Sequence, residues 1–420
     1  MFNQMRTFIV GGYVRDRLLG LNPKDKDYVV TGVTEKEFLE NSPFNEVFKK
    51  IDAHSFPVFH DSFGNEWALA RSEKKVGSGY HGFDVKFGPV LSIEDDLSRR
   101  DLTINSMAIE VFDGTKTRLM KVIDPHGGQN DLRNKIIRHT SEAFEEDPVR
   151  VLRISRFRAR MGGDWAVAQE TKDLIFSMSR KGVLNELTSE RIWKEMSRAL
   201  MEPNPWLFFD TLHECDVLHV IFPEIYRLKT ALECLRYHPE GNAYEHTRLV
   251  LNQAVKNNYD LETRFACLVH DIGKGISPRN DLPKHYGHDT KGVAVAKDFA
   301  NRLRVPAKMR DRACKIVRYH MIGHKLDILN PKTFVKMFDN MGVRNDPSIV
   351  DLLMRVCECD TRGREGYENA PITHLQKIER KAKAYSSVNF ANVFPNGETN
   401  TNKIQQEMYK AKLKAVKDEN

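Results

Sequence analysis

The sequence predicts an α+β protein, with a mixed head at the amino-terminal end and helical units after it. Short β-type runs alternate with glycine, proline and aspartate up to about residue 140. Amphipathic helical runs begin after Pro148, and a second helical block after Phe222 is rich in histidine. We expect a head over residues 1–140, a helical neck over 141–225, a histidine-rich helical domain over 226–366 and a helical tail over 367–420.

The composition narrows the class of protein. The 65 lysines and arginines against 58 acidic residues give a net charge of +7, which fits a nucleic-acid partner without identifying one. No apolar run approaches the ~18–20 residues of a transmembrane helix, and no signal peptide opens the chain. The six cysteines contain no CxxC pair, which argues against a disulfide framework. We expect a cytoplasmic protein with no membrane partner.

A glycine turn follows the first of five strands expected in the head. Gly11 and Gly12 precede a short helix, and Arg15 lies on its first turn. Such a turn brings backbone N–H groups close to phosphate, and an arginine can bind two phosphate oxygens. A tight turn that merely needs glycine explains the pattern equally well. The five strands are expected at Thr7–Val10, Tyr28–Thr31, Glu66–Ala70, Phe83–Phe87 and Met107–Phe112.

Two aspartates stand thirteen residues after this turn. Asp25 and Asp27 are expected on one face of a strand, with their Cα atoms ~6.6–7 Å apart. Two carboxylates on one face can hold a pair of Mg²⁺ ions ~3.5–4 Å apart, the separation used in phosphoryl transfer. The same pair at the start of a strand is often a solvated turn. Its position after a glycine turn favours the metal site.

The first helix after the head carries a stripe of arginines. At ~100° per residue, four arginines fall within about 120° of one another; they are Arg150, Arg153, Arg156 and Arg160. A solvated basic face is one explanation. Asp147 before Arg150 favours another, because together they offer the acceptor and donors that a nucleobase edge needs. The expected helices are Arg150–Arg160, Glu170–Ser179, Ser189–Leu200, Leu207–Leu212 and a charged, solvated helix over Ile404–Asn420.

Histidines gather in the second helical block. Seven of the 15 histidines lie between residues 238 and 324, where a uniform spread would give about three, and this enrichment indicates a metal site. His270 and Asp271 are adjacent at a helix end closed by Gly273, and His246 is expected on a facing helix. Any single histidine can also be an ordinary surface or core residue. That interpretation is preferred for His238, His285 and His324.

Five sequence blocks carry a family likeness. They are GGYVRDRLLG…KDKDYVV, RSEKKVGSGYHGF, EDDLSRRDLTINSMAIE, DPHGGQNDL and EDPVRVLRISRFRAR. In this order they resemble the class II (bacterial-type) tRNA nucleotidyltransferases, the CCA-adding enzymes. A later block, HTRLV…RFACLVHDIGKG…HYGH, is similar to the HD phosphohydrolase domain of one branch of that family. The likeness implies a polymerase-β-like head with a small mixed sheet, a neck that recognises nucleobases and binds tRNA, and a helical HD domain.

For the head, the resemblance implies a phosphate site and a catalytic site. Gly12 and Arg15 would bind the phosphates of the incoming nucleotide. Asp25 and Asp27 would be the catalytic residues and would hold Mg²⁺. Arg100 would contact the nucleotide or the primer end.

For the helix after the head, the resemblance implies nucleobase recognition. Asp147 and Arg150 would read the base edges of CTP and ATP, and Arg153 and Arg156 would add nucleotide contacts. Asp101 is either a third acidic residue near the metals or a cap for the turn that follows it.

For the histidine-rich domain, the resemblance implies a divalent transition metal such as Ni²⁺. Its ligands would be His246, His270, Asp271 and Asp360. His288 and His320 could complete a second metal site, and Lys274 either binds phosphate or is a charge at a helix end. In the family this domain hydrolyses phosphate esters, including 2′,3′-cyclic phosphodiesters and 2′-nucleotides.

The implied function is addition of C, C and A to the 3′ end of tRNA from CTP and ATP, combined with phosphohydrolysis that repairs RNA ends. A poly(A) polymerase or A-only enzyme is a first alternative. The loop over Arg71–Phe83, which in the family is associated with the switch from C to A addition, argues against it. A phosphohydrolase with a non-catalytic, RNA-binding head is a second alternative, disfavoured by Asp25 and Asp27. A monomer and a homodimer are both compatible with the sequence.

Overall fold

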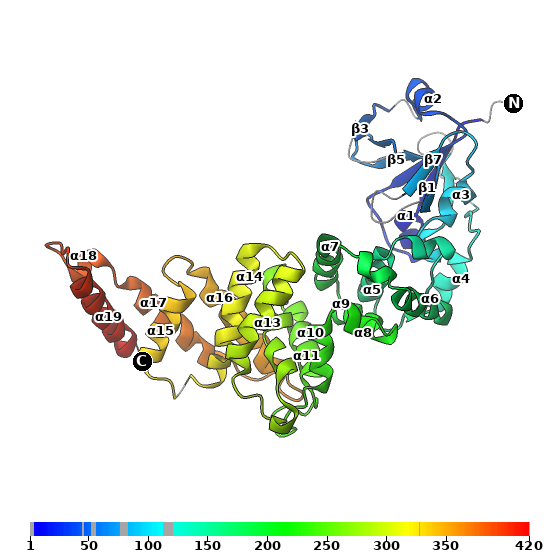
Figure 1. Ribbon diagram of the computed structural model, residues 1–420. Helices are drawn as coiled ribbons and strands as arrows, with labels where there is room; N and C mark the ends of the chain where they lie inside the picture. The colour runs from blue at the N-terminus through cyan, green and yellow to red at the C-terminus, as the bar shows by residue number, and fades with distance from the viewer. Residues whose placement is uncertain are drawn as a thin grey trace. The chain divides into compact units, whose positions relative to one another are not determined.

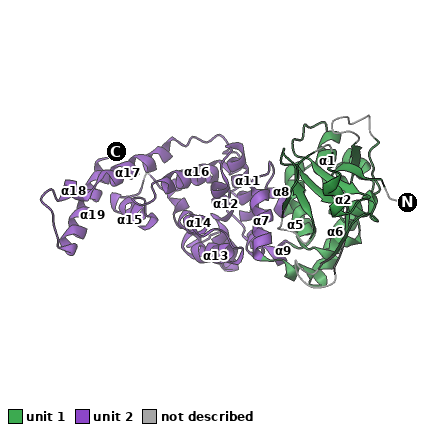
Figure 2. Cartoon of the chain, turned by 90° about the horizontal axis from the view of Figure 1, so that it is seen from above, with its two compact units in different colours: residues 1–188, 210–217 green, residues 189–209, 218–420 purple. Residues whose placement is uncertain are grey.

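The computed structural model describes residues 4–43, 46–51, 56–75, 83–111, 121–326 and 328–419. The chain forms two compact units, coloured separately in Figure 2: Met1–Thr188 with Asp210–Val217, and Ser189–Phe209 with Leu218–Asn420. The first unit holds the strands and the second is helical (Figure 1), so the expected α+β class with a small mixed sheet is confirmed. The finer boundaries at residues 140, 225 and 366 stay a prediction.

The first unit is built on a six-stranded mixed sheet with the order β3-β4-β5-β2-β1-β8. Strands β2 and β5 run parallel, and the other neighbouring strands pair antiparallel. Phe8, Val10 and Val29 pack beneath the sheet with Leu97 and Ala108, all of them buried. The strands are β1 (Arg6–Val10), β2 (Asp27–Thr31), β3 (Lys49–Ile51), β4 (Val58–His60), β5 (Glu66–Leu69) and β8 (Ala108–Val111).

A separate hairpin corrects the expected loop over Arg71–Phe83. Strand β6 (Arg71–Lys75) pairs antiparallel with β7 (Phe83–Phe87), so both ends of the expected loop are strands. Strand β6 could not be predicted from its sequence, RSEKK, because this segment has no alternation of apolar and polar residues. The centre of that loop, 76–82, lies outside the described residues.

The helices of the first unit alternate with its strands along the chain and then follow them. Two of them begin with a capping box, formed by Thr34 with Glu37 and by Ser92 with Asp95. A short parallel pair, β9 (Ile136–Ile137) and β10 (Ala166–Val167), precedes the last helix. These helices are α1 (Gly12–Leu18), α2 (Glu35–Glu40), α3 (Ile93–Ser98), α4 (Gly128–Asn134), α5 (Val149–Met161) and α6 (Gln169–Arg180).

The second unit is a bundle of helices around an apolar core. Its core includes Val250, Ala266, Phe334 and Leu353, contributed by different helices and fully buried. The bounds are α7 (Ser189–Leu200), α8 (Trp206–Glu214, shared with the first unit), α9 (Leu218–Ile221), α10 (Pro223–Arg227), α11 (Ala243–Lys256), α12 (Leu261–Val269), α13 (His288–Arg302), α14 (Ala307–Tyr319), α15 (Pro331–Met341), α16 (Ser348–Arg362), α17 (Gln376–Ser387), α18 (Phe390–Val393) and α19 (Thr401–Asp418). None of the described helices is long and apolar enough to span a membrane.

The last helix, α19, is less solvated than its sequence predicts. Val416 is fully buried, and Lys381 Nζ donates to the Val416 carbonyl at 2.8 Å. Lys412 Nζ lies 2.7 Å from an Asp339 oxygen. One face of α19 therefore packs against α15 and α17, although the charged sequence of this helix predicts that it is solvated.

Candidate functional site

The glycine turn of the head sits between β1 and α1. Gly11 has φ +70° and donates from its N–H to the Met107 carbonyl at 3.1 Å. A Cβ at this position would stand 3.0 Å from Arg100 Nη1. Glycine is needed here both for the left-handed backbone and for the close approach of the Arg100 guanidinium.

Three carboxylates meet beside this turn. Asp27 is the first residue of β2 and is the register partner of Glu66 on the parallel strand β5. Partial desolvation, the Glu66 carboxylate and Asp25 raise the pKa of Asp27 above its usual range, while Arg100 opposes the shift. The expected strand containing both aspartates is wrong, because β2 begins at Asp27 and Asp25 lies in the irregular segment before it. Sequence reasoning missed Glu66, because only the pairing of two distant strands brings it here.

Arg15, predicted to bind phosphate, points into the protein. Its side chain is 3% exposed, with Nε 2.7 Å from Asp16 Oδ1 and Nη1 2.6 Å from Asn105 Oδ1. Burial lowers the pKa of the guanidinium, and Asp16 opposes that shift. Arg160 Nη2 reaches the other oxygen of Asp16 at 3.3 Å. The phosphate role of Arg15 stays a prediction, and it requires these hydrogen bonds to be exchanged.

A buried aspartate aligns the arginines next to the carboxylates. Asp96 is fully buried and accepts from Arg99 Nη2 at 2.6 Å and from Arg100 Nη2 at 3.0 Å. Burial alone would raise the pKa of Asp96, but the two arginines outweigh it and hold the pKa at about 2. Asp96 is therefore charged and directs Arg100 toward the glycine turn.

Asp101 caps the turn that follows it. Its Oδ1 accepts from the Leu102 N–H at 2.9 Å and from Asn105 Nδ2 at 3.2 Å. Its Oδ2 accepts from Arg153 Nε at 2.7 Å. Arg153 and these hydrogen bonds overcome the effect of burial and hold its pKa at about 2. These contacts tie Asp101 to the turn that follows it, and a position near the metals stays a prediction.

The arginines of α5 differ in exposure: Arg150 is buried, whereas the side chains of Arg153 and Arg160 are 36% and 43% exposed. Arg150 is 9% exposed and donates to the carbonyls of Ala143 at 2.8 Å and Arg99 at 2.6 Å. The Arg156 guanidinium carbon lies 5.3 Å from the centre of the Phe157 ring. Asp147 accepts from the Val149 N–H at 3.1 Å. The expected reading of base edges by these residues stays a prediction.

The second unit contains a cavity of about 1000 Å³ with a cluster of histidines and aspartates. His246 comes from α11, His270 and Asp271 follow α12, and Asp360 comes from α16. Nε2 of His246 lies 3.1 Å from Asp360 Oδ1, and Nε2 of His270 lies 3.2 Å from Asp271 Oδ2. The structure thus brings together the four residues that the HD likeness singles out.

Two further histidines converge on the same aspartate. Nε2 of His288 and of His320 lie 3.2 Å and 3.3 Å from Asp271 Oδ1. The approach depends on Gly273, whose Cβ would stand 2.2 Å from the His288 carbonyl oxygen. Asp271, His288 and His320 form a second buried group of possible metal ligands.

The protonation of these histidines indicates a cation. Nδ1 of His270, His288 and His320 lies within 2.7–2.9 Å of a backbone carbonyl and must carry the proton. Their Nε2 atoms, with Asp271 Oδ1, are buried and have no hydrogen-bond partner among the described residues. With Nε2 unprotonated, its lone pair faces the carboxylate lone pairs of Asp271 Oδ1 at 3.2–3.3 Å, and either a shared proton or a bound metal ion relieves this repulsion. The residues therefore fit a divalent metal.

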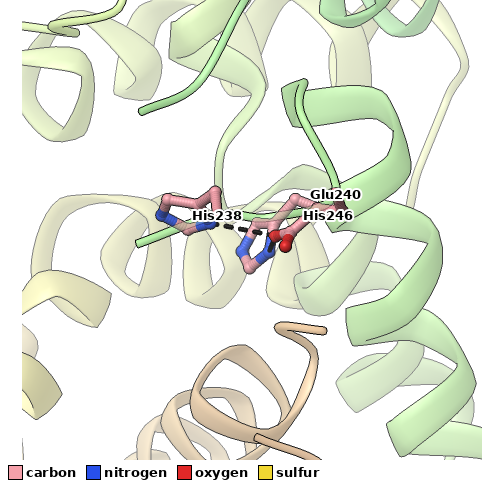
Figure 3. A group of neighbouring side chains, drawn as sticks. All are labelled: His238, Glu240 and His246. Atoms are coloured by element: carbon pink, nitrogen blue, oxygen red, sulfur yellow. Dashed lines mark hydrogen bonds and ion pairs between the residues drawn. The ribbon is translucent and has the colours of Figure 1, made fainter. Parts of the chain in front are cut away.

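A carboxylate behind His246 fixes the orientation of its ring (Figure 3). Glu240 Oε1 accepts from His246 Nδ1 at 2.8 Å and from His238 Nδ1 at 3.0 Å. Asp360 and Glu240 raise the pKa of His246 to about 9, although burial opposes the shift. A buried carboxylate in this position directs Nε2 toward a metal. Glu240 carries no sequence signal of its own, and only the fold reveals its role.

Two of the three histidines expected to be ordinary residues belong to the cluster. His238 shares Glu240 with His246, and His324 Nε2 lies 2.7 Å from Asp360 Oδ2. His285 instead contacts Ser277 Oγ and the Leu232 carbonyl, as a satisfied polar residue does.

Lys274 is tied to the same cluster. Its Nζ lies 2.7 Å from Asp271 Oδ2 and 2.5 Å from Glu233 Oε1, and the lysine is buried. Burial would lower its pKa, but the two carboxylates raise the pKa above its usual range. Lys274 is a fixed positive charge that orients Asp271.

Three family models match the chain. The model described as Poly A polymerase head domain matches residues 7–138, and the one described as Probable RNA and SrmB- binding site of polymerase A matches 165–228. The HD domain model matches 243–360. All the residues of the histidine cluster from His246 to Asp360 lie within this last match.

Close relatives span nearly the whole chain. The multifunctional CCA protein of Acinetobacter baumannii (strain SDF) is 43% identical over 386 residues, which are 91% of this chain and 90% of that protein. The multifunctional CCA protein of Mannheimia succiniciproducens is 40% identical over 420 residues, covering 98% and 97% of the two chains.

Solved structures share the fold at lower identity. An apo form of a CCA-adding enzyme has a TM-score of 0.67 at 21% identity and covers 98% of this chain and 88% of its own. The Thermotoga maritima CCA-adding enzyme complexed with tRNA has a TM-score of 0.63 at 20% identity, covering 99% and 88%.

Proposed function

The chain belongs to the multifunctional CCA protein family of tRNA nucleotidyltransferases, and we propose that it adds C, C and A to the 3′ end of tRNA from CTP and ATP. The observation that carries this proposal is the group of Asp25, Asp27 and Glu66 beside the Gly11 turn, with Arg100 directed at the same turn. Three carboxylates next to an arginine suit a metal-bound triphosphate.

In the proposed reaction the terminal tRNA hydroxyl attacks the α-phosphorus of the nucleotide. A new P–O bond forms, the bond to pyrophosphate breaks, and the hydroxyl proton is released. Asp25, Asp27 and Glu66 would hold Mg²⁺, which would stabilise the negative charge on the phosphate oxygens during this displacement. Arg100, held by Asp96, would face the phosphates, and the backbone N–H groups at the start of α1 would bind them.

Nucleobase selection is assigned to the start of α5. CTP and ATP both present an exocyclic amine where UTP and GTP present a carbonyl, so an acceptor at Asp147 favours the correct pair. Arg150, Arg153 and Arg156 would donate to the base edge or to the phosphates. Arg150 and Arg153 donate to protein oxygens, so nucleotide binding by these arginines would exchange those contacts.

Incubation of the protein with tRNA that ends at the discriminator base tests this function. CTP alone should extend the tRNA by two residues, and CTP with ATP by three. Extension by ATP alone, without incorporation of C, would instead support an A-only enzyme or a poly(A) polymerase.

For the second unit we propose a metal-dependent phosphohydrolase that acts on 2′,3′-cyclic phosphodiesters, 2′-nucleotides and related phosphate esters. The convergence of unpaired Nε2 atoms on Asp271 carries this proposal. His246, His270, Asp271 and Asp360 would hold a transition metal such as Ni²⁺, and His288 and His320 a second one. The metal supplies activation of water and of the phosphoryl group.

The chain's own groups set up the hydrolysis. Water adds its oxygen to phosphorus, one ester P–O bond breaks, and the leaving oxygen takes a proton. Lys274 fixes Asp271, Glu240 fixes His246, and His324 contacts Asp360, so the reacting groups have little freedom. This activity would trim damaged RNA ends before nucleotide addition.

A further inference from the structure

Two exposed tyrosines line the cavity of the second unit. Tyr237 is 55% exposed and Tyr286 is 64% exposed, and both belong to the cavity wall. They come from separate segments, one before α11 and one before α13. In the described parts of the chain neither ring stacks on another aromatic ring, although each has a cation nearby. Exposed aromatic faces at one opening offer a surface for a flat ligand.

Basic residues lie next to both tyrosine rings and line the cavity. The Arg236 guanidinium carbon lies 5.6 Å from the centre of the Tyr237 ring, and Lys284 Nζ lies 5.9 Å from that of Tyr286. Lys284, Lys325 and Arg364 line the cavity. Aromatic rings and basic groups thus line the same cavity as the histidine cluster, a combination that binds single-stranded nucleic acid.

The size of the cavity argues in the same direction. About 1000 Å³ is more than a simple phosphate ester fills, and it is at the upper end of sites for ligands of nucleotide size. Isolated exposed aromatics are common on protein surfaces and need no explanation. Two of them at the entrance to a phosphoester site are a different case.

We propose that Tyr237 and Tyr286 form a nucleobase subsite that stacks the base next to the phosphoester undergoing hydrolysis. The subsite makes the second unit selective for nucleotide phosphoesters over small phosphate esters. The inference rests on the proposed phosphohydrolase function and adds the residues that select its substrate. The base can belong to a free nucleotide or to the 3′ end of an RNA.

The test compares three substrates with the full-length, metal-loaded protein. They are 2′,3′-cyclic AMP, a short RNA ending in a 2′,3′-cyclic phosphate, and glycerol 2-phosphate, which has no base. Tyr237→Ala and Tyr286→Ala should each raise KM for at least one of the two base-containing substrates by about tenfold, with little change in kcat. Hydrolysis of glycerol 2-phosphate should be unchanged. Whichever base-containing substrate is affected identifies the source of the base.

Matched variants separate stacking from other effects. Tyr237→Phe and Tyr286→Phe keep the ring and should behave as wild type. Tyr409→Ala removes an exposed tyrosine of α19 that is not part of the cavity wall, and should also have no effect. An equal loss on glycerol 2-phosphate, or no loss on either base-containing substrate, would overturn the proposal.

Binding of adenosine, which has the base but no phosphoester to hydrolyse, is measured by calorimetry and tests the subsite independently of catalysis. Each alanine variant should weaken the binding about tenfold relative to wild type. Unchanged affinity would overturn the subsite even if hydrolysis is observed. Weaker binding without any hydrolysis by the wild type would support the subsite and reject the phosphohydrolase function.

Discussion

The ligand atoms of the cavity cluster already face one another, whereas the arginines around the head carboxylates are engaged with other protein groups. In the cluster, backbone carbonyls fix the tautomers of His270, His288 and His320. In the head, Arg15 is bound to Asp16 and Arg153 to Asp101. The second unit is thus prepared for a cation, while the proposed nucleotide contacts of Arg15 and Arg153 require their internal hydrogen bonds to be exchanged.

The largest expected effect is in the head. Asp27→Asn removes a charge that we propose binds metal, at the point where Glu66 and Asp25 converge, and should lower CCA addition by roughly a thousandfold. Hydrolysis of 2′,3′-cyclic AMP should remain. Incorporation of labelled CTP and ATP into tRNA measures the first activity, and Asp173→Asn, an exposed aspartate on α6, is the control. Unimpaired addition would support a head that only binds RNA.

A matching change in the second unit should remove phosphohydrolysis and leave CCA addition intact. Asp271→Asn takes a charge from the point where His288, His320 and Lys274 meet, and should abolish phosphohydrolysis to below about a thousandth. Bound metal, measured by mass spectrometry of the purified protein, should fall as well. CCA addition should be intact, and its collapse would contradict two independent sites. His219→Ala, on the exposed face of α9, is the control.

A smaller effect on metal binding is expected for Glu240, which contacts His246 on the side away from the proposed metal. Glu240→Ala leaves His246 Nδ1 without its carboxylate partner and should weaken metal binding about 10- to 100-fold. Glu240→Gln keeps an acceptor and should weaken it less. Titration of the full-length protein with Ni²⁺ in competition with a chelator measures the affinity. Glu245→Gln, on α11 but outside the cluster, should leave it unchanged, and equal affinities for all variants would remove the positioning role of Glu240.

The sequence predicts the elements and residues that depend on local pattern. Helix α7 has the expected bounds, and His246, His270, Asp271 and Asp360 meet as their motif indicates. Strands β3 and β4, with three residues each, are too short to show a period.

Groups joined only by the tertiary fold could not be predicted. Glu66 reaches Asp27 through a parallel register, and Glu240 reaches His246 across a turn. The inward direction of Arg15 depends on Asn105, ninety residues away. The orientation and contacts of such side chains depend on their burial and on their neighbours in the fold, and residue type alone does not predict them.

The smallest effect concerns the carboxylate that aligns the head arginines. The pKa of Asp96 is about 2 in the folded protein, against 3.8 for a free aspartate. A lowered pKa stabilises the fold at pH above the unfolded value, and this contribution is lost as the pH falls through the folded value. Asp96→Asn should therefore lower the free energy of unfolding by about 2 kcal/mol at pH 7.

The pH dependence distinguishes this charge from ordinary packing. In urea unfolding of the full-length protein, the difference between wild type and Asp96→Asn should shrink toward zero as the pH approaches 2. A difference that is the same at pH 7 and pH 3 would show that the charge is not responsible. Because Asp96 holds Arg100, the variant should also raise KM for CTP while hydrolysis in the second unit stays constant. An unchanged KM would mean that Arg100 reaches the nucleotide without Asp96, so that the head is less dependent on internal partners than its contacts indicate.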